Sequence, residues 1–140
     1  WSFGGYLTCY AMLKAPGRFH AGAAVAPVTD WRLYDTIYTE RYMEHPEDSP
    51  DGYHDSSPVN FADSLEGSLL LAHGVSDDNV HVQNTYNMID ALLKANKEYE
   101  LYAYPQKSHG IWGDEHRIHL FQRILDFFKE ELLQHPNEQE

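Results

Sequence analysis

The stretch LLLAHGVSDDNVH, residues 69–81, joins a run of apolar side chains to a pair of adjacent aspartates. The apolar run from Ser68 to Gly74 is short and continuous, which is typical of a strand buried on both faces of a parallel sheet. Asp77 and Asp78 come just after it, at the carboxyl end of the predicted strand. Because open α/β sheets carry their sites at that edge, the two aspartates are candidate site residues.

Similar apolar runs on either side predict two more strands, from His20 to Val28 and from Tyr99 to Pro105. Between the second and third strands, and again after the third, apolar residues recur at helical spacing. The predicted buried faces are Val82, Tyr86, Ile89 and Leu93 in one helix, and Phe121, Ile124, Leu125, Phe128 and Leu132 in the other. A further helix is expected from Tyr6 to Ala15. This alternation of helices and strands indicates an α/β protein.

The segment from Trp31 to Pro58 departs from the alternation. It is polar and interrupted by prolines and a glycine, so we expect an insertion above the sheet rather than a core strand. A short helix is predicted within it, from Tyr34 to Met43. The acidic tail, residues 134–140, is expected to fray.

The chain begins WSFGGY, with Ser2 between two aromatic residues and two glycines close behind. A serine followed by x-Gly-Gly and a helix matches most of the nucleophile elbow G-x-S-x-G, a sharp turn that exposes the serine hydroxyl. The first glycine of that motif, and the strand that feeds it, would lie before Trp1. By itself this pattern does not distinguish an elbow from an ordinary turn into a helix.

A histidine after the third predicted strand completes the set. His109 stands in YAYPQKSHGIW, so Ser, Asp and His occur in the chain order of α/β-hydrolase catalytic triads. His109 would take the proton of the Ser2 hydroxyl, and a buried carboxylate would hold the imidazole in its tautomer. The backbone N–H of Phe3 is expected to stabilise the oxyanion. Together these residues predict covalent serine catalysis.

Composition argues against several other classes of function. The formal net charge is −12 with only ten lysines and arginines, which does not suit a surface for nucleic acid or anionic membranes. No apolar run approaches the roughly 20 residues that span a bilayer. Cys9 is the single cysteine and is expected to be a small buried hydrophobe. No metal or cofactor is predicted, because no third ligand stands at suitable spacing beside His73, His81, His116 or His119.

Four motifs resemble the prolyl oligopeptidase family of serine peptidases, and most of all its dipeptidyl peptidase IV branch. They are WSFGGY, APVTDWRLYDTIYTERYM, LLLAHGVSDDNVHVQNT and HGI. The resemblance runs from Trp1 to about Leu133. It implies that residues 1–140 are the C-terminal part of an α/β-hydrolase catalytic domain, packed against an N-terminal β-propeller of the same protein. The implied activity is release of N-terminal dipeptides from peptide substrates, after proline or alanine.

The resemblance also implies roles for individual residues. It assigns the nucleophile to Ser2, the base to His109 and the acid to Asp77, the first aspartate of SDDN, rather than to Asp78. Phe3 departs from the tyrosine of many relatives. Since the oxyanion donor at that position is the backbone N–H, this departure leaves the expected chemistry unchanged.

The implied substrate site lies mainly in the insertion. Asn79 matches a residue that holds a substrate carbonyl, and Arg41 matches an arginine near the anchor of the substrate N-terminus. The proline pocket is implied to comprise Val28, Trp31, Tyr34, Tyr38 and Val80. Proline is a compact ring, and aromatic walls suit it. Alternatively Tyr34 and Tyr38, spaced i and i+4, form the inner face of a helix packed on the core.

Two other functions stay open at this point: an esterase or acyl-peptide hydrolase on the same fold, and a non-catalytic member whose pocket serves as a binding surface. The resemblance further suggests a homodimer and a periplasmic or extracellular location. The isolated 140-residue piece is expected to be inactive, because a sheet without the strand before the elbow has a raw edge that promotes self-association.

Overall fold

Three parallel strands form the centre of the molecule. The computed structural model describes residues 1–133, and the tail that was expected to fray lies outside the described residues. The elements in chain order are α1 (Phe3–Lys14), β1 (Ala21–Val25), η1 (Trp31–Leu33), α2 (Thr36–Met43), α3 (Pro50–Ser56), η2 (Pro58–Ser64), β2 (Ser68–Gly74), α4 (Gln83–Lys94), β3 (Glu100–Tyr104) and α5 (Asp114–Leu133). No helix within these residues is long and apolar enough to cross a membrane.

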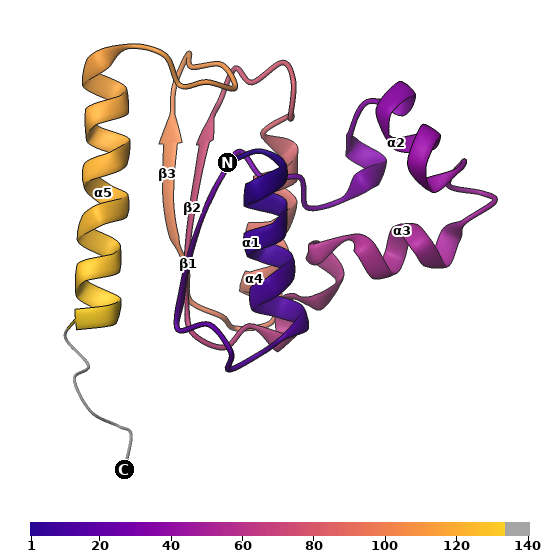
Figure 1. Cartoon of the computed structure of the whole chain (residues 1–140), viewed down its shortest axis with the longest axis horizontal. Helices are drawn as coiled ribbons and strands as arrows, with labels where there is room; N and C mark the ends of the chain where they lie inside the picture. Colours follow the sequence, from indigo (N-terminus) through magenta and orange to yellow (C-terminus); the bar gives the residue numbers. More distant parts are fainter. Residues whose placement is uncertain (134–140) are drawn as a thin grey trace.

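The strands lie in the order β1-β2-β3, and both pairs are parallel. In register, Ala21 faces Ser68 across the first pair, and Gly74 faces Tyr104 across the second. All three carboxyl ends therefore lie at one edge of the sheet (Figure 1). This arrangement confirms the predicted α/β class. Within residues 1–133, the outer edge of β1 pairs with no other strand.

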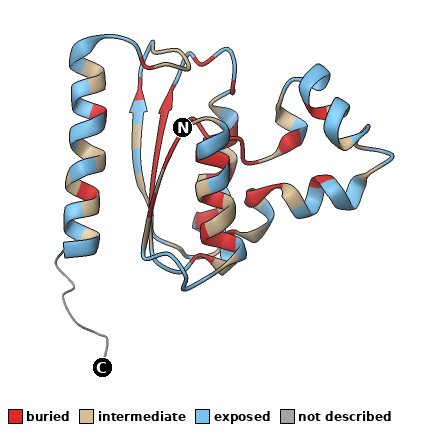
Figure 2. Ribbon diagram, in the orientation of Figure 1, coloured by how far each residue is buried: buried red, intermediate tan, exposed pale blue. Residues whose placement is uncertain are grey.

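Helices cover both faces of the sheet: α5 lies on one side, and α1 and α4 lie on the other (Figure 1). Side chains of β2 alternate between these layers. Leu69 and Leu71 pack with residues of α1 and α4, whereas Leu70 and Ala72 pack with residues of α5. Figure 2 shows buried positions concentrated on the central strands and on the inward side of α1. The prediction of β2 as a strand buried on both faces is thus confirmed.

The buried face predicted for α4 is correct only for Ile89, which is partly buried and packs against the core. The buried residues of α4 are Asn84, Thr85, Met88 and Leu92, whereas Tyr86 and Leu93 are 46% and 61% exposed. Hydropathy misplaced this face because two of the buried side chains are polar. Thr85 bonds the ring of His73, and Asn84 accepts a hydrogen bond from the N–H of Thr29, so both are buried with partners.

The face predicted for α5 is correct in part. Ile124 and Phe128 are partly buried and pack with the core, but Phe121, Leu125 and Leu132 are exposed. The two fully buried residues of this helix are Leu120 and Phe127, which the apolar spacing did not single out. The helix carries apolar residues on more than one face, so periodicity alone does not fix which of them meets the sheet.

The strand and helix ends also differ from prediction. β1 ends at Val25 rather than Val28, because Ala26 has a φ of 46° and Pro27 follows it. Helix α1 begins at Phe3, three residues before the predicted start. β3 was predicted to be buried on both faces, but as an edge strand its residues alternate between half-buried and exposed until Tyr104.

The insertion is more helical than its composition suggested. It contains η1, the predicted short helix as α2, and then α3 and η2, which were not predicted. Proline stands at the first turn of both α3 and η2, where its missing N–H costs no intrahelical bond. The segment extends past α1 and α4 on their side of the sheet, with α2 level with the carboxyl ends of the strands (Figure 1).

Candidate active site

Ser2 lies in a strained turn at the carboxyl edge of the sheet. Its backbone angles are φ 56° and ψ −121°, a conformation that side-chain-bearing residues rarely adopt. Its N–H donates to the carbonyl oxygen of Val25 at 2.8 Å, and α1 begins at the next residue. A Cβ on Gly5 would come within 2.8 Å of the same Val25 oxygen, so the helix approaches the strand closely here. This is the geometry expected of a nucleophile elbow.

The structure brings Ser2, His109 and Asp77 together. Nε2 of His109 lies 3.0 Å from Oγ of Ser2, and Nδ1 of His109 lies 2.7 Å from Oδ2 of Asp77. Because the carboxylate can only accept at Nδ1, the proton lies on that nitrogen and Nε2 is free to accept the serine proton. The arrangement can therefore activate a hydroxyl nucleophile.

Asp77 rather than Asp78 occupies the acid position. The Asp77 side chain is fully buried, while Asp78 is exposed to solvent. The second oxygen of Asp77, Oδ1, accepts the backbone N–H groups of Asn79 and Val80, each at 2.9 Å. The turn after β2 thus fixes the orientation of the carboxylate independently of His109.

Three contacts hold the loop that carries His109, and sequence patterns did not single out the residues that make them. The indole N–H of Trp1 donates to the carbonyl oxygen of His109 at 3.0 Å. Arg117 donates from Nε and Nη2 to the carbonyl oxygen of Gly110. Gly74, at the end of β2, lies against the same loop, where an added Cβ would come 2.4 Å from the Ser108 oxygen. Trp1 belongs to the motif WSFGGY and Gly74 ends the predicted strand, but nothing in the sequence around either residue indicated its contact with the His109 loop.

The N–H of Phe3 is placed to serve as an oxyanion donor. Phe3 is the first residue of α1, and the first N–H groups of a helix have no intrahelical acceptor. The helix dipole adds partial positive charge at this end. The location next to Ser2 suits a developing oxyanion on an attacked carbonyl.

The predicted pocket residues form one aromatic cluster beside the elbow. Trp31, Val28 and Val80 are buried together, with Tyr34 packed against them. The ring of Tyr38 stacks on Trp31 with 6.3 Å between centroids, and it meets Tyr34 edge-on at 5.4 Å. Burial in this cluster raises the pKa of the Tyr34 phenol above its ordinary value.

The cluster reaches the acid loop through one hydrogen bond. The hydroxyl of Tyr34 donates to Oδ1 of Asn79 at 2.8 Å, which leaves the Asn79 amide N–H groups available to a ligand. Arg41, the remaining predicted residue, is exposed on α2, and its guanidinium lies 5.6 Å from the ring of Tyr42. The structure therefore brings every predicted pocket residue except Arg41 into one connected set.

A cavity of about 300 Å³ opens beside this cluster and next to the elbow. Its lining is mostly aromatic and is made by Phe3, Tyr6, Trp31, Tyr38, Thr39, Tyr42, Met43 and Ser56. Apolar walls beside a nucleophile suit a ligand with an apolar ring or side chain.

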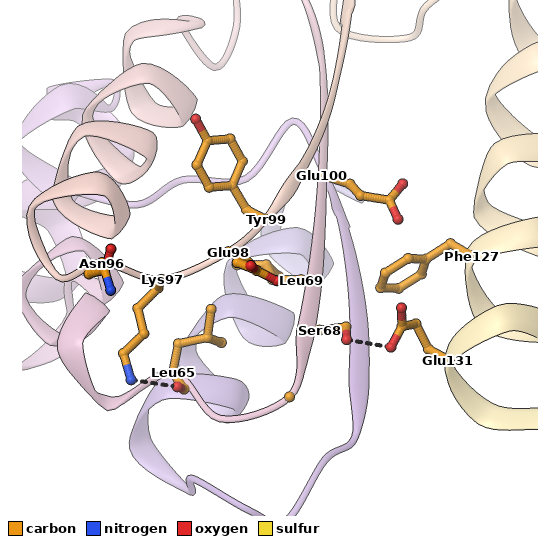
Figure 3. A pocket seen from close by; sticks show the side chains of 11 residues that line it. Leu65, Ser68, Leu69, Asn96, Lys97, Glu98, Tyr99, Glu100, Phe127 and Glu131 are labelled. Carbon is orange, nitrogen blue, oxygen red and sulfur yellow. Dashed lines mark hydrogen bonds between the residues drawn. The ribbon is translucent and has the colours of Figure 1, made fainter. Parts of the chain in front are cut away.

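A second cavity, of about 350 Å³, lies at the amino ends of the strands (Figure 3). Ser68, the first residue of β2, bonds Glu131 there at 2.5 Å, and Lys97 donates to the carbonyl oxygen of Leu65. This cavity is at the opposite end of β2 from Asp77 and is no part of the catalytic arrangement. Among residues 1–133, no group of histidine, cysteine or carboxylate side chains is arranged to hold a metal ion.

Comparison with known proteins identifies the family of this chain. The sequence profile of the prolyl oligopeptidase family matches residues 1–135. "Probable dipeptidyl-aminopeptidase B" of Aspergillus fumigatus is 45% identical over 130 residues, which are 91% of this chain and 14% of that protein. "Dipeptidyl aminopeptidase B" of Saccharomyces cerevisiae is 43% identical over 132 residues, which are 92% of this chain and 16% of that protein.

A solved structure is similar as well. The crystal structure of Porphyromonas gingivalis dipeptidyl peptidase 4 superimposes with a TM-score of 0.92 and 45% identity, over 94% of this chain and 19% of that one. The chain thus spans less than a fifth of the length of each of these proteins.

Proposed function

The chain belongs to the prolyl oligopeptidase family of serine peptidases, and on that premise we propose that the protein containing it releases N-terminal dipeptides from peptides, after proline or alanine. The observation that carries the proposal is the hydrogen-bonded series from Ser2 through His109 to Asp77. The names of the similar proteins support the dipeptidyl part of it.

In the proposed reaction, Oγ of Ser2 bonds the carbonyl carbon of the scissile amide while His109 takes the hydroxyl proton. The oxyanion that forms accepts the N–H of Phe3. When the C–N bond breaks, His109 returns the proton to the leaving amine, and an acyl-enzyme remains. A water molecule then attacks in the same manner and frees the dipeptide. Asp77 keeps the imidazole oriented and stabilises its protonated form throughout.

The proposed specificity rests on the aromatic cluster. A proline ring is compact, and it would fit between the walls supplied by Trp31, Tyr34 and Tyr38. The free amide N–H groups of Asn79 would donate to a substrate carbonyl. Arg41 is proposed to act near the anchor of the substrate N-terminus.

The wider assembly is proposed from the resemblance: a β-propeller of the same protein covering this domain, and a homodimer. The 140-residue chain taken alone is proposed to be inactive. Its strand β1 has an open outer edge among the described residues, and an open edge promotes self-association.

The test uses the complete protein and three chromogenic substrates: a Gly-Pro amide, an amide of N-acetylated alanine, and a simple aryl ester. We expect the protein to prefer the free Gly-Pro amide. We expect Ser2→Ala to lower the rate of its turnover by a factor on the order of 10⁴ or more. Preference for the acetylated amide would indicate an acyl-peptide hydrolase instead. Turnover of the ester alone would indicate an esterase, and turnover of none would indicate a binding protein.

A further inference from the structure

His73 is a buried histidine that the proposed mechanism does not use. It is the sixth residue of β2, and its side chain is fully buried one residue before the strand ends. Nδ1 of its ring lies 2.7 Å from the hydroxyl oxygen of Thr85 in α4. Nε2 lies 2.8 Å from the carbonyl oxygen of Val80 and 3.2 Å from Oδ2 of Asp77.

These neighbours determine the tautomer of the ring. A carbonyl oxygen can only accept, so Nε2 of His73 carries the proton and donates it to Val80. Nδ1 then accepts from the hydroxyl of Thr85. Burial lowers the pKa of His73 below its ordinary value, which keeps the ring neutral. The Nε2–H group of His73 therefore points at the Val80 carbonyl oxygen and at Oδ2 of Asp77.

His73 faces the turn that holds the proposed catalytic acid, Asp77. The peptide groups on both sides of Val80 take part, because its N–H donates to Oδ1 of Asp77 while its C=O accepts from His73. The same His73 N–H edge also faces Oδ2, the oxygen that accepts the hydrogen bond of His109. His73 thus contacts the acid directly and through the turn that fixes it.

We propose that His73 is a positioning residue for the catalytic acid: its neutral ring, locked by Thr85, closes the turn around Asp77 and shares the charge of Oδ2 with His109. The proposal rests on the proposed function, since it concerns the same Ser2, Asp77 and His109 site. It adds a residue that touches neither the substrate nor the reacting atoms. Asn79 and Val80, which form one side of the proposed substrate pocket, belong to the same turn. His73 therefore supports both the acid and that side of the pocket.

Loss of the His73 donor has two expected consequences. The turn loosens, which moves His109 and slows the reaction of Ser2. In addition, the negative charge on Oδ2 of Asp77 is no longer reduced by the His73 hydrogen bond, so it stabilises the protonated form of His109 more strongly. The reaction, which needs neutral His109, then requires a higher pH. The titratable groups around the acid are the imidazoles of His73 and His109 and, farther away, the phenol of Tyr34. A change at His73 therefore removes a neutral hydrogen-bond donor from this set and alters no formal charge.

Two variants of similar size separate the two ends of the ring. In His73→Gln the amide nitrogen is the same number of bonds from Cα as Nε2, so the donor to Val80 is kept. In His73→Asn the polar atoms reach only as far as Nδ1, so that donor is lost. His119→Asn serves as a control, because His119 bonds the hydroxyl of Tyr104 on the other side of the sheet. Thermal unfolding of each variant reports whether it is folded.

The readout is the rate at which a fluorophosphonate labels Ser2 in the complete protein, measured across pH. Labelling joins Oγ to phosphorus, expels fluoride and leaves the proton on His109, so it needs the Ser2 site but no dipeptide substrate. His73→Asn is expected to label about tenfold more slowly at neutral pH, with its half-maximal rate shifted to higher pH. His73→Gln and His119→Asn are expected to stay within about twofold of the parent.

The proposal is overturned if folded His73→Asn labels at the parental rate with the parental pH midpoint, or if His73→Gln is impaired equally. Should His73→Asn not fold, Thr85→Val decides: it removes the hydroxyl that holds Nδ1, so the ring can tilt away from Val80 and labelling must also slow, and parental behaviour overturns the proposal. Failure of the parent to label would overturn the proposed serine chemistry and this role with it. A parent that labels but releases no dipeptide would overturn only the proposed substrate.

Discussion

The guanidinium of Arg117 donates two hydrogen bonds, of 3.1 and 3.0 Å, to the carbonyl oxygen of Gly110, the residue that follows His109. The same guanidinium lies 4.0 Å from the ring centroid of Trp112 and 5.6 Å from that of Trp1. Arg117 stands in the first turn of α5, so the helix and the catalytic loop are joined at this point. The planar guanidinium is suited to such a forked contact, and a lysine is not.

Arg117→Lys is expected to lower kcat/KM about tenfold, because the His109 loop loses its forked contact while the charge is kept. Arg123→Lys is the matched control, since Arg123 lies on the same helix and bonds only Asp126 among the side chains of that helix. Steady-state kinetics of the complete protein on a Gly-Pro amide measures both. Equal kinetics for the two variants would contradict the role given to Arg117.

Asp77→Asn is expected to lower kcat by several orders of magnitude, because an amide cannot hold the imidazole in the required tautomer and charge state. Asp78→Asn should have an effect of less than about threefold, since its side chain is exposed. The comparison needs only kcat at saturating substrate. Equal losses in the two variants would show that the acid has been assigned wrongly.

Ser2→Ala and Ser2→Gly are both expected to abolish turnover, but their stabilities should differ. The backbone of Ser2 has a φ of 56°, which glycine adopts without strain. We therefore expect Ser2→Gly to unfold at a higher temperature than Ser2→Ala, by a free-energy difference of about 1 kcal/mol. Calorimetry of the two proteins provides the measurement, and an alanine variant as stable as the glycine variant would exclude strain at the elbow.

Tyr38→Ala is expected to raise KM for a Gly-Pro amide about tenfold with little change in unfolding temperature. The Tyr38 ring stacks on Trp31 but is 43% exposed, so it contributes more to the pocket wall than to the core. Ile37→Ala, one residue earlier on α2 and 85% exposed, is the control and should leave KM unchanged. Unaltered kinetics in Tyr38→Ala would mean that the tyrosine is only a packing residue.

The stability of the fold should fall as the pH drops below about 6.5, the ordinary pKa of histidine. Burial lowers the pKa of His73 in the folded protein, so the unfolded chain binds this proton at a higher pH than the folded chain does. The contribution is present above the unfolded pKa and is lost as the pH falls toward the folded one. Unfolding temperatures measured between pH 5 and 8 should therefore depend on pH more steeply in the parent than in His73→Gln.

The meeting of Ser2, Asp77 and His109 was predictable from sequence because each residue lies directly beside a predicted element end. Asp77 and His109 follow apolar runs that become parallel strands, and parallel strands place their carboxyl ends at one edge. The glycines after Ser2 pointed to an elbow only in combination with Asp77 and His109, which follow it in the chain order of a triad. The α/β class followed from the same runs. These features are local, and local patterns are what a single sequence displays.

The supporting contacts were not predictable for a physical reason. The Trp1 indole meets the His109 carbonyl across most of the chain length, and Arg117 meets a backbone oxygen that has no sequence signature. Hydropathy counts Thr85 as a polar surface position, but its hydrogen bond to His73 allows it to be buried. The helix α3 was hidden by prolines and polar residues that its first turn accommodates.

The proposed nucleophile, acid, base and aromatic walls all lie between positions 2 and 109 of one unbroken segment. Recombination that exchanges this segment as a whole would therefore transfer these residues together as one inherited unit. What such an exchange must match is the neighbour on the outer edge of β1, since within the described residues that strand has no partner there.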